Sequence, residues 1–349
     1  METLSVKISD PTLEKSQKIL KNAGQIIKNG GLVIFPTETV YGLGGDATDA
    51  LAAEKIYTAK GRPSDNPLII HISDPVEAEG YTYTNRMYYE LANTFMPGPI
   101  TVVLRAKDTV PKTVTAGLDT VAVRCPSHPI ARAFIRETGV PIAAPSANLS
   151  GSPSPTCYKH VADDMDGRVD MIIDGGECEI GLESTIVKIE DDNSLTLLRP
   201  GAITVEDLHE VCDNVRIADA VLGALKDGEK VLSPGMKYKH YAPKSQFYLL
   251  DGAFEKRFDY IKNNCTNSVL FCYEEEIEAF SGILPRDMIF NIGKESDMLT
   301  QAHNLFTLLR EADLKNADEI YATLPSTQGM GLALYNRMIR AAAHRIIEL

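Results

Sequence analysis

The 349-residue sequence is poor in cysteine and has no tryptophan. Its six cysteines are scattered, none of them in a CxxC pair, and no histidine cluster accompanies them. This spacing argues against a zinc motif and a disulfide framework, and it favours a reducing compartment. No stretch approaches the roughly 20 apolar residues that a membrane-spanning helix needs, and residues 1–10 do not resemble a secretory signal. We therefore expect a cytoplasmic protein with no membrane partner.

Basic residues are also in short supply, since 35 Lys and Arg face 48 Asp and Glu and give a net charge of −13. Proteins that bind long nucleic acids usually carry a basic surface, because phosphate neutralisation dominates their affinity. The acidic balance therefore favours small anionic ligands, although a local basic cleft can still focus its own field.

The two common nucleotide-binding motifs are absent or misplaced. No Walker A sequence occurs, so any use of ATP does not involve a P-loop. Residues 42–47 match the dinucleotide fingerprint GxGxxA, but Pro36 and a hydroxyl-rich turn separate them from the preceding apolar run. We interpret this glycine-rich segment as a structural turn.

The length exceeds that of one ordinary core, so two domains are expected. In residues 1–202, apolar periodicity predicts helices at 13–28, 49–59 and 129–137. Short apolar runs predict strands at 32–35, 68–72, 101–104, 121–124, 140–144, 169–173, 184–189 and 195–198. This pattern indicates a mixed α/β sheet domain.

The pattern changes after residue 202. Residues 203–244 show little periodicity beyond a short helix at 205–211 and contain two prolines near their end, which is typical of a linker. In residues 245–349, strands predicted at 247–250, 269–273, 288–292 and 320–322 alternate with helices at 255–262, 296–311 and 331–347. This alternation predicts a smaller, Rossmann-like parallel-sheet domain.

Lys60 and Arg62 stand at the end of a predicted helix, separated by one glycine. Two cations on a loop fixed by glycine and proline can grip a phosphate chain, since arginine forks onto two oxygens and lysine supplies a point charge. The structural alternative is that both cations compensate the helix dipole. The residues alone leave both interpretations open.

Residues 143–156 contain four serines, Asn148 and three prolines just after a predicted buried strand. Such a segment can form a cradle of hydroxyl, amide and backbone N–H groups for a phosphate or nucleotide. Composition alone favours the other interpretation, a polar surface loop.

Two further polar residues belong to apolar strands. Arg124 ends the run at 121–124, where it forms either a structural ion pair or a carboxylate-binding group. His71 lies inside the apolar run at 68–72, and a lone histidine there is usually a satisfied structural group.

At these same residues the chain resembles the Sua5/YrdC/YwlC family. The matching segments follow in order at 35–43, 60–63, 66–68, 97–99, 123–124, 144–148 and 198–201. The YrdC-like part covers about residues 14–202, and the run at 233–243 is similar to the hallmark of the longer, two-domain Sua5 type. The KxR and SxN signature of the family falls without departure on Lys60, Arg62, Ser146 and Asn148.

The resemblance implies a YrdC-like mixed twisted sheet with helices, followed by the smaller Rossmann-like α/β domain. It implies a nucleotidyltransferase that condenses L-threonine, bicarbonate or CO₂ and ATP into threonylcarbamoyl-AMP and pyrophosphate, for the t6A modification of tRNA. Mg²⁺ is expected on the ATP phosphates, with no side-chain metal cluster. The implied partners are a downstream threonylcarbamoyl transferase complex and, through a weak contact, tRNA.

The resemblance also implies site residues. The catalytic set is Lys60, Arg62, Ser146 and Asn148. These four would bind ATP together with Asn66, Thr120, Ser154, Arg199 and Tyr241. Threonine would be bound by Thr39, His71, Arg124, Ala144 and Ser184. Residues 233–243 are hypothesised to form a lid that excludes water from a labile carbamate and adenylate.

Two rival functions remain at this stage. One is a double-stranded RNA or tRNA-binding module, which the acidic net charge disfavours. The other is a carbamoyltransferase that matures hydrogenases and carries a YrdC-like domain. Such proteins also have an acylphosphatase domain and CxxC zinc fingers, which this sequence lacks.

Overall fold

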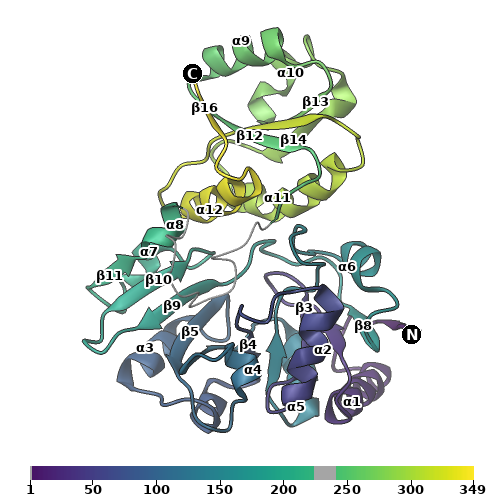
Figure 1. Ribbon diagram of the computed structural model, residues 1–349, viewed down its shortest axis with the longest axis vertical. Coiled ribbons are helices and arrows are strands. Elements are labelled where there is room, and N and C mark those ends of the chain that lie inside the picture. Colours follow the sequence, from purple (N-terminus) through teal and green to yellow (C-terminus); the bar gives the residue numbers. More distant parts are fainter. Residues whose placement is uncertain (1, 224–240) are drawn as a thin grey trace. The chain divides into compact units, whose positions relative to one another are not determined.

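The structure is a computed structural model that describes residues 2–223 and 241–349. It divides into two compact units (Figure 1). The first comprises Met1–Ser150, Ser154–Glu179 and Glu183–Lys237, and the second comprises Gly151–Pro153, Ile180–Leu182 and Tyr238–Leu349.

Within the described residues, the first unit is built on a mixed sheet of eleven strands in the order β1-β8-β2-β3-β7-β4-β6-β5-β9-β10-β11. The strands are β1 (Leu4–Lys7), β2 (Val33–Phe35), β3 (Gly42–Asp46), β4 (Ile69–His71), β5 (Ile100–Arg105), β6 (Thr120–Arg124), β7 (Ile142–Ala144), β8 (Met171–Asp174), β9 (Thr185–Ile189), β10 (Leu195–Arg199) and β11 (Val215–Ile217). The predicted mixed α/β class is confirmed.

Helices surround this sheet in Figure 1. They are α1 (Glu14–Lys28), α2 (Ala50–Lys60), the 3₁₀ helix η1 (Pro75–Gly80), α3 (Arg86–Phe95), α4 (Lys112–Thr115), α5 (Pro129–Thr138), α6 (Tyr158–Met165), α7 (Val205–Leu208) and α8 (Asp219–Leu222). Helices α3 and α6 and strand β1 were not predicted, although the buried residues Tyr88, Leu91 and Ala92 of α3 recur at helical spacing.

One apolar cluster fixes the part of the sheet from which the site loops emerge. It joins Leu20 of α1 and Phe134 of α5 to Phe35 of β2 and Ala144 of β7. The two helices pack closely, since a Cβ on Gly24 would lie 2.9 Å from the carbonyl oxygen of Glu137. Burial of these side chains stabilises the fold by about 1.5–3 kcal/mol for each large residue. The loops after β2 and β7 therefore begin from fixed points.

The glycine-rich segment is not the predicted turn. Residues Gly42–Asp46 form strand β3, which pairs antiparallel with both β2 and β7. A Cβ on Gly44 would lie 2.7 Å from Cγ2 of Ile142 and 3.0 Å from the ring of Phe35. Glycine is required here by close packing between side chains, and sequence reasoning mistook this requirement for turn chemistry.

Part of the predicted linker also belongs to the first sheet. Strand β11 pairs parallel with β10, and helices α7 and α8 flank it within residues 203–223. The prediction of a linker failed here because β11 has only three residues, Val215–Ile217, too few for their alternation to mark a strand. Residues 233–240 of the predicted lid lie outside the described residues.

The second unit contains a parallel sheet of five strands among its described residues, in the order β14-β13-β15-β12-β16. Its elements are β12 (Gln246–Asp251), α9 (Phe254–Asn264), β13 (Ser268–Tyr273), η2 (Glu274–Glu276), α10 (Ile277–Phe280), η3 (Arg286–Met288), β14 (Ile289–Gly293), α11 (Met298–Ala312), β15 (Glu319–Thr323), α12 (Gly331–Ala341) and β16 (Ile346–Glu348). Helices α9 and α10 lie on one side of this sheet and α11 and α12 on the other (Figure 1), which agrees with the predicted Rossmann-like arrangement.

The last predicted helix is too long. Helix α12 ends at Ala341, because Ala343 and His344 adopt left-handed φ angles of 48° and 61°. The chain then forms β16, which pairs with β12. No described helix is both long and apolar enough to cross a membrane.

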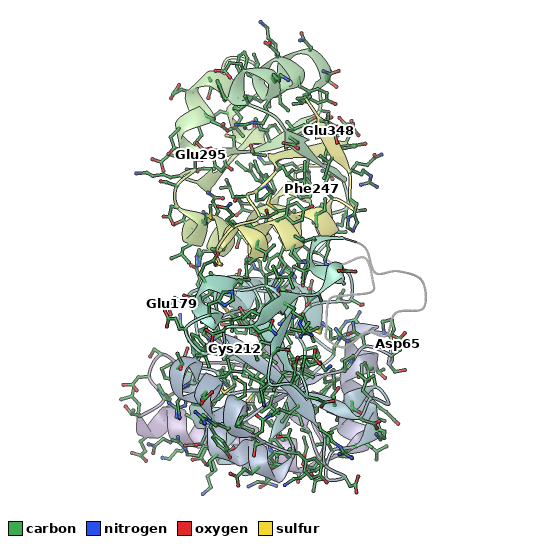
Figure 2. All side chains as sticks on the ribbon, turned by 90° about the vertical axis from the view of Figure 1, so that its left-hand side faces the viewer. Asp65, Glu179, Cys212, Phe247, Glu295 and Glu348 are labelled. Atoms are coloured by element: carbon green, nitrogen blue, oxygen red, sulfur yellow. The ribbon has the colours of Figure 1, made fainter. Side chains whose placement is uncertain are left out.

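The surface shows the acidic composition. Asp65, Glu179, Glu295 and Glu348 are exposed and project outward in Figure 2, whereas Phe247 is buried in the core of the second unit. Surface charge of one sign keeps a protein soluble and disfavours a polyanionic partner.

Candidate functional site

The structure brings three of the four signature residues, Lys60, Ser146 and Asn148, together around the amine of Lys60. Lys60 is the last residue of α2, which ends because Gly61 adopts a left-handed φ of 61°. Its side chain is only 2% exposed, and Nζ donates to the carbonyl oxygens of Ser146 and Asn148 and, at 3.3 Å, to Oδ1 of Asn148. The amine thus turns toward the loop after β7, so dipole compensation alone does not account for it.

Arg62 follows on the same loop. Its Nη2 atom lies 3.4 Å from the carbonyl oxygen of Asn66 and 3.3 Å from that of Pro67, both near the limit for a hydrogen bond. Asn66 itself is 1% exposed, and its Oδ1 is buried with no hydrogen-bond partner among the described residues. The segment therefore presents a guanidinium and an unused amide oxygen close together.

The loop after β7 is anchored and largely buried, unlike the polar surface loop that its composition favoured. The backbone N–H of Leu43 donates to the carbonyl of Pro145, and that of Ala147 donates to the carbonyl of Tyr41, both within 2.9 Å. The hydroxyl of Ser146 donates to Oδ1 of Asn148 at 2.6 Å. Strand β3 thus holds the SxN segment in place.

Arg124 forms the structural ion pair that was one of its two predicted roles. Its Nη2 donates to Oε1 of Glu38 at 2.7 Å, with side-chain exposures of 5% and 4%. Glu38 belongs to the turn after β2, which also carries Thr39. The Oγ1 atoms of Thr37 and Thr39 lie 2.9 Å apart.

His71 neighbours this pair, since β4 and β6 align it with Arg124. Burial and the charge of Arg124 lower the pKa of His71 to about 3, so its imidazole is neutral near pH 7. Its Nδ1 lies 3.1 Å from the carbonyl oxygen of Ile69. His71 is the satisfied, buried group that the apolar run predicts.

A second connected group joins residues that were predicted for different substrates. Arg199 donates through Nε to the carbonyl of Ser184 at 3.0 Å and through Nη2 to its Oγ at 3.1 Å. The same Oγ lies 2.8 Å from Oγ1 of Thr101. Ser154 donates to the carboxylate of Glu183, the residue before Ser184.

Three further predicted residues belong to other parts of the fold or contact the site only through backbone. Thr120 begins β6 at the end opposite Arg124, roughly 13 Å away at the usual rise per residue. Ala144 ends β7 and pairs through its backbone with Ile69. Tyr241 belongs to the second unit, where its ring stacks on Phe306 at 5.1 Å.

Sequence reasoning missed the buried polar neighbours of the predicted residues. Glu38, Thr101 and His128 were not predicted as site residues, although Glu38 stands directly beside Thr39. His128 has a buried Nδ1 with no described hydrogen-bond partner, and burial lowers its pKa while the charge of Glu38 raises it. A glutamate between two threonines after an apolar run was the signal available for Glu38.

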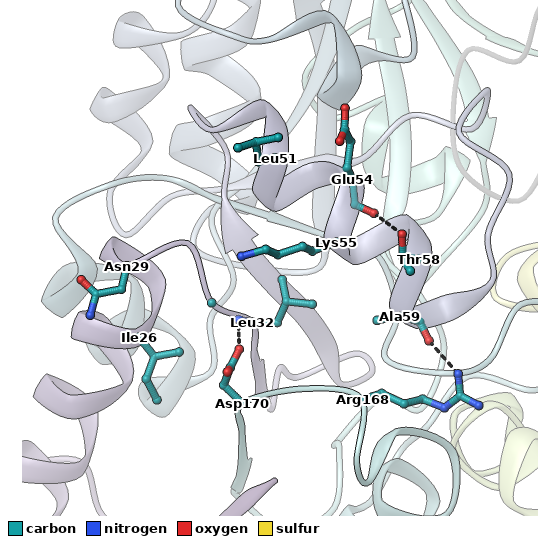
Figure 3. Close-up of a pocket in the computed structure, with 11 residues that line it drawn as sticks. Ile26, Asn29, Leu32, Leu51, Glu54, Lys55, Thr58, Ala59, Arg168 and Asp170 are labelled. Atoms are coloured by element: carbon teal, nitrogen blue, oxygen red, sulfur yellow. Dashed lines mark hydrogen bonds between the residues drawn. The ribbon is translucent and has the colours of Figure 1, made fainter. Parts of the chain in front are cut away.

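A cavity of about 870 Å³ lies on the opposite side of α2 and contains none of the predicted site residues (Figure 3). It is lined by the end of α1, the outer face of α2 and the approach to β8. Its polar groups are engaged, since Asp170 accepts from the N–H of Leu32 at 2.7 Å and Arg168 donates to the carbonyl of Ala59 at 3.4 Å. This cavity is separate from the candidate site.

The described residues hold no group of three or more His, Cys, Asp or Glu side chains that could bind a metal ion. Lys60, Arg62, Ser146 and Asn148 supply two cations, a hydroxyl and an amide, which suit the oxygens of phosphates. A Mg²⁺ ion that keeps most of its waters and binds through substrate phosphates fits such a site.

Comparisons with known proteins cover nearly the whole chain. The Sua5–YciO–YrdC family model, described as "Telomere recombination", matches residues 25–201. A second model, described as "Threonylcarbamoyl-AMP synthase, C-terminal domain", matches residues 203–343. The chain is 42% identical to threonylcarbamoyl-AMP synthase of Bacillus subtilis, with 94% of each sequence covered. It is also 42% identical to that of Pyrococcus abyssi, over 95% of this chain and 96% of the relative.

Solved structures agree. The crystal structure of Pyrococcus abyssi Sua5 complexed with L-threonine matches with a TM-score of 0.87 and 39% identity, and each chain is covered completely (100% and 100%). Escherichia coli YciO matches with a TM-score of 0.51 and 26% identity, over 58% of this chain and 96% of YciO.

Proposed function

Because this chain belongs to the Sua5 family of threonylcarbamoyl-AMP synthases, we propose that it condenses L-threonine, bicarbonate or CO₂ and ATP into threonylcarbamoyl-AMP and pyrophosphate. The observation that carries the proposal is the convergence of Ser146 and Asn148 on the amine of Lys60. It places a cation and a hydroxyl–amide loop in one position, as binding of a phosphate chain requires.

The reaction needs positioning and charge stabilisation, and it needs no nucleophile from the protein. The threonine amine attacks CO₂, loses a proton and becomes a carbamate. A carbamate oxygen then attacks the α-phosphorus of ATP, and pyrophosphate leaves. Mg²⁺ on the triphosphate would neutralise part of the charge that develops on the leaving group.

On the ATP side, we assign Lys60 and Arg62 to charge stabilisation and Ser146 and Asn148 to holding the nucleotide. Lys60 orders the loop through its three contacts with it. Arg62 follows Lys60 on the same loop, and its guanidinium can donate two parallel hydrogen bonds to phosphate oxygens. Asn66, Ser154 and Arg199 complete this assignment.

On the threonine side, Arg124 is the cation for the carboxylate. His71 beside it is neutral near pH 7, so Arg124 and not His71 supplies the positive charge there. The structure of Sua5 from Pyrococcus abyssi was determined with L-threonine, which supports an amino-acid site in this fold. Thr39, Ala144 and Ser184 are assigned to the same substrate.

The product would pass to a threonylcarbamoyl transferase complex that modifies tRNA in the cytoplasm. The protein itself would contact tRNA only weakly, because its net charge is −13. This acidity also disfavours the alternative of a double-stranded RNA-binding module.

The proposal is tested with labelled bicarbonate, L-threonine, ATP and Mg²⁺. We expect label in an adenylate, and pyrophosphate release, only when all components are present. Pyrophosphate release that is the same with and without threonine would refute the proposed function.

A further inference from the structure

The ion pair between Arg124 and Glu38 is buried but joined by a single hydrogen bond. Nη2 of Arg124 reaches Oε1 of Glu38 at 2.7 Å. The neighbouring atoms Nε of Arg124 and Oε2 of Glu38 are both buried without a hydrogen-bond partner among the described residues. The carboxylate of Glu38 therefore holds the guanidinium of Arg124 through Nη2 alone, and Nε and Nη1 make no described hydrogen bond.

Glu38 is held by a turn with its own internal bonds. Oγ1 of Thr37 accepts from the N–H groups of Thr39 and Val40, each at 3.2 Å, and donates to the carbonyl of Val40 at 2.6 Å. All residues of this turn are buried. The carboxylate of Glu38 is consequently a fixed point against which Arg124 is oriented.

We propose that Glu38 is a positioning residue, which holds the guanidinium of Arg124 so that Nη1 faces the carboxylate of the amino-acid substrate. The inference rests on the proposed function, which assigns Arg124 to that carboxylate. Nη1 takes part in no described hydrogen bond and is not among the buried atoms that lack a partner, so it is the nitrogen left open to a ligand.

A contribution to folding stability alone does not explain why Arg124 and Glu38 form a buried ion pair. Removing two charges from water costs about as much as their attraction returns, and an apolar pair of similar volume often stabilises a fold equally well. Orientation is the stronger reason, because an arginine without an anchor must be ordered by its ligand. Ordering one such side chain costs on the order of tenfold in affinity.

The test compares Glu38→Ala and Glu38→Gln with the wild-type protein. Binding of L-threonine is measured by calorimetry, and pyrophosphate release is measured as a function of threonine and of ATP. For Glu38→Ala we expect the Kd and KM for threonine to rise about tenfold, with kcat and the KM for ATP within about twofold of wild type. Glu38→Gln retains an acceptor for Nη2, so its Kd and KM for threonine are expected to lie between those of the wild type and those of Glu38→Ala.

A matched control is Glu276→Ala in the second unit. Glu276 forms the other described buried ion pair, with Arg257, also at 2.7 Å. Its loss should lower thermal stability and leave the Kd for threonine unchanged. If Glu38→Ala fails to fold, the folded Glu38→Gln variant decides through the same measurements.

A second probe is L-threoninol, which lacks the carboxylate. Its affinity should be the same for the wild type and for Glu38→Ala, because Glu38 acts only through the carboxylate contact of Arg124. An unchanged Kd for threonine in Glu38→Ala, or an equal loss for threoninol, would overturn the inference. A wild type that binds threonine yet releases no pyrophosphate would instead refute the proposed function.

Discussion

Among single residues, Lys60 is the one whose side chain connects the loop at 146–148 with the proposed chemistry. It is buried at the end of α2 and donates to three oxygens of the loop at 146–148. Removing it leaves buried carbonyl oxygens without a donor and, under the proposed function, removes a charge that stabilises the ATP phosphates, so one substitution would affect both the loop and the chemistry.

We expect Lys60→Ala to lower the rate of pyrophosphate release by at least a factor of about 10², the usual cost of one lost charge-stabilising donor. The matched control is Lys55→Ala on the same helix, since Lys55 is exposed and donates only to the carbonyl of Gly30 among its described contacts. A near-wild-type rate for Lys60→Ala would show that Lys60 does not stabilise charge in the reaction and that other residues do so.

His71 gives a prediction for stability and pH. Its pKa is about 3 in the folded chain, whereas an unfolded histidine has a pKa near 6.5. Between these values the unfolded chain takes up a proton that the folded chain does not. Stability therefore falls as the pH drops below about 6.5, and at pH 5 this one group costs about 2 kcal/mol.

The measurement is urea unfolding of the wild type and His71→Asn at pH 7.5 and pH 5. Other titrating groups act alike in both proteins, so the wild type should lose about 2 kcal/mol more than the variant between the two pH values. Equal losses would show that His71 is protonated in the folded protein.

Among the elements, strand β3 shows how packing overrides local chemistry. Its glycines occupy extended positions between β2 and β7, where side chains from both neighbours fill the space. Helix α12 shows the opposite case, since two left-handed residues end a helix whose apolar pattern continues.

Gly44→Ala should destabilise the protein by about 1–3 kcal/mol, because the new Cβ would lie 2.7 Å from Ile142 and the core must shift. Gly80→Ala is the control, since nothing lies within 4 Å of a Cβ at that position. Calorimetric melting temperatures compare the two. A neutral Gly44→Ala would mean that turn propensity and not packing selects this glycine.

For the whole molecule, the sequence alone determined the fold class of each domain and the positions of the KxR and SxN signature. Apolar runs and periodicity suffice for buried strands and amphipathic helices, because burial of one face imposes the period. The resemblance fixed Lys60, Arg62, Ser146 and Asn148 in advance, and the structure brings Lys60, Ser146 and Asn148 into contact.

Only the tertiary structure decided which residues support the site. The pairing of Glu38 with Arg124 joins positions 86 residues apart, and the sharing of Ser184 between Arg199 and Thr101 joins three separate strand ends. No local pattern encodes such contacts, since they depend on strand order in the sheet. The same holds for β11, a three-residue strand that forms because it pairs with the edge strand β10. Propensity is local, but burial and pairing belong to the fold as a whole.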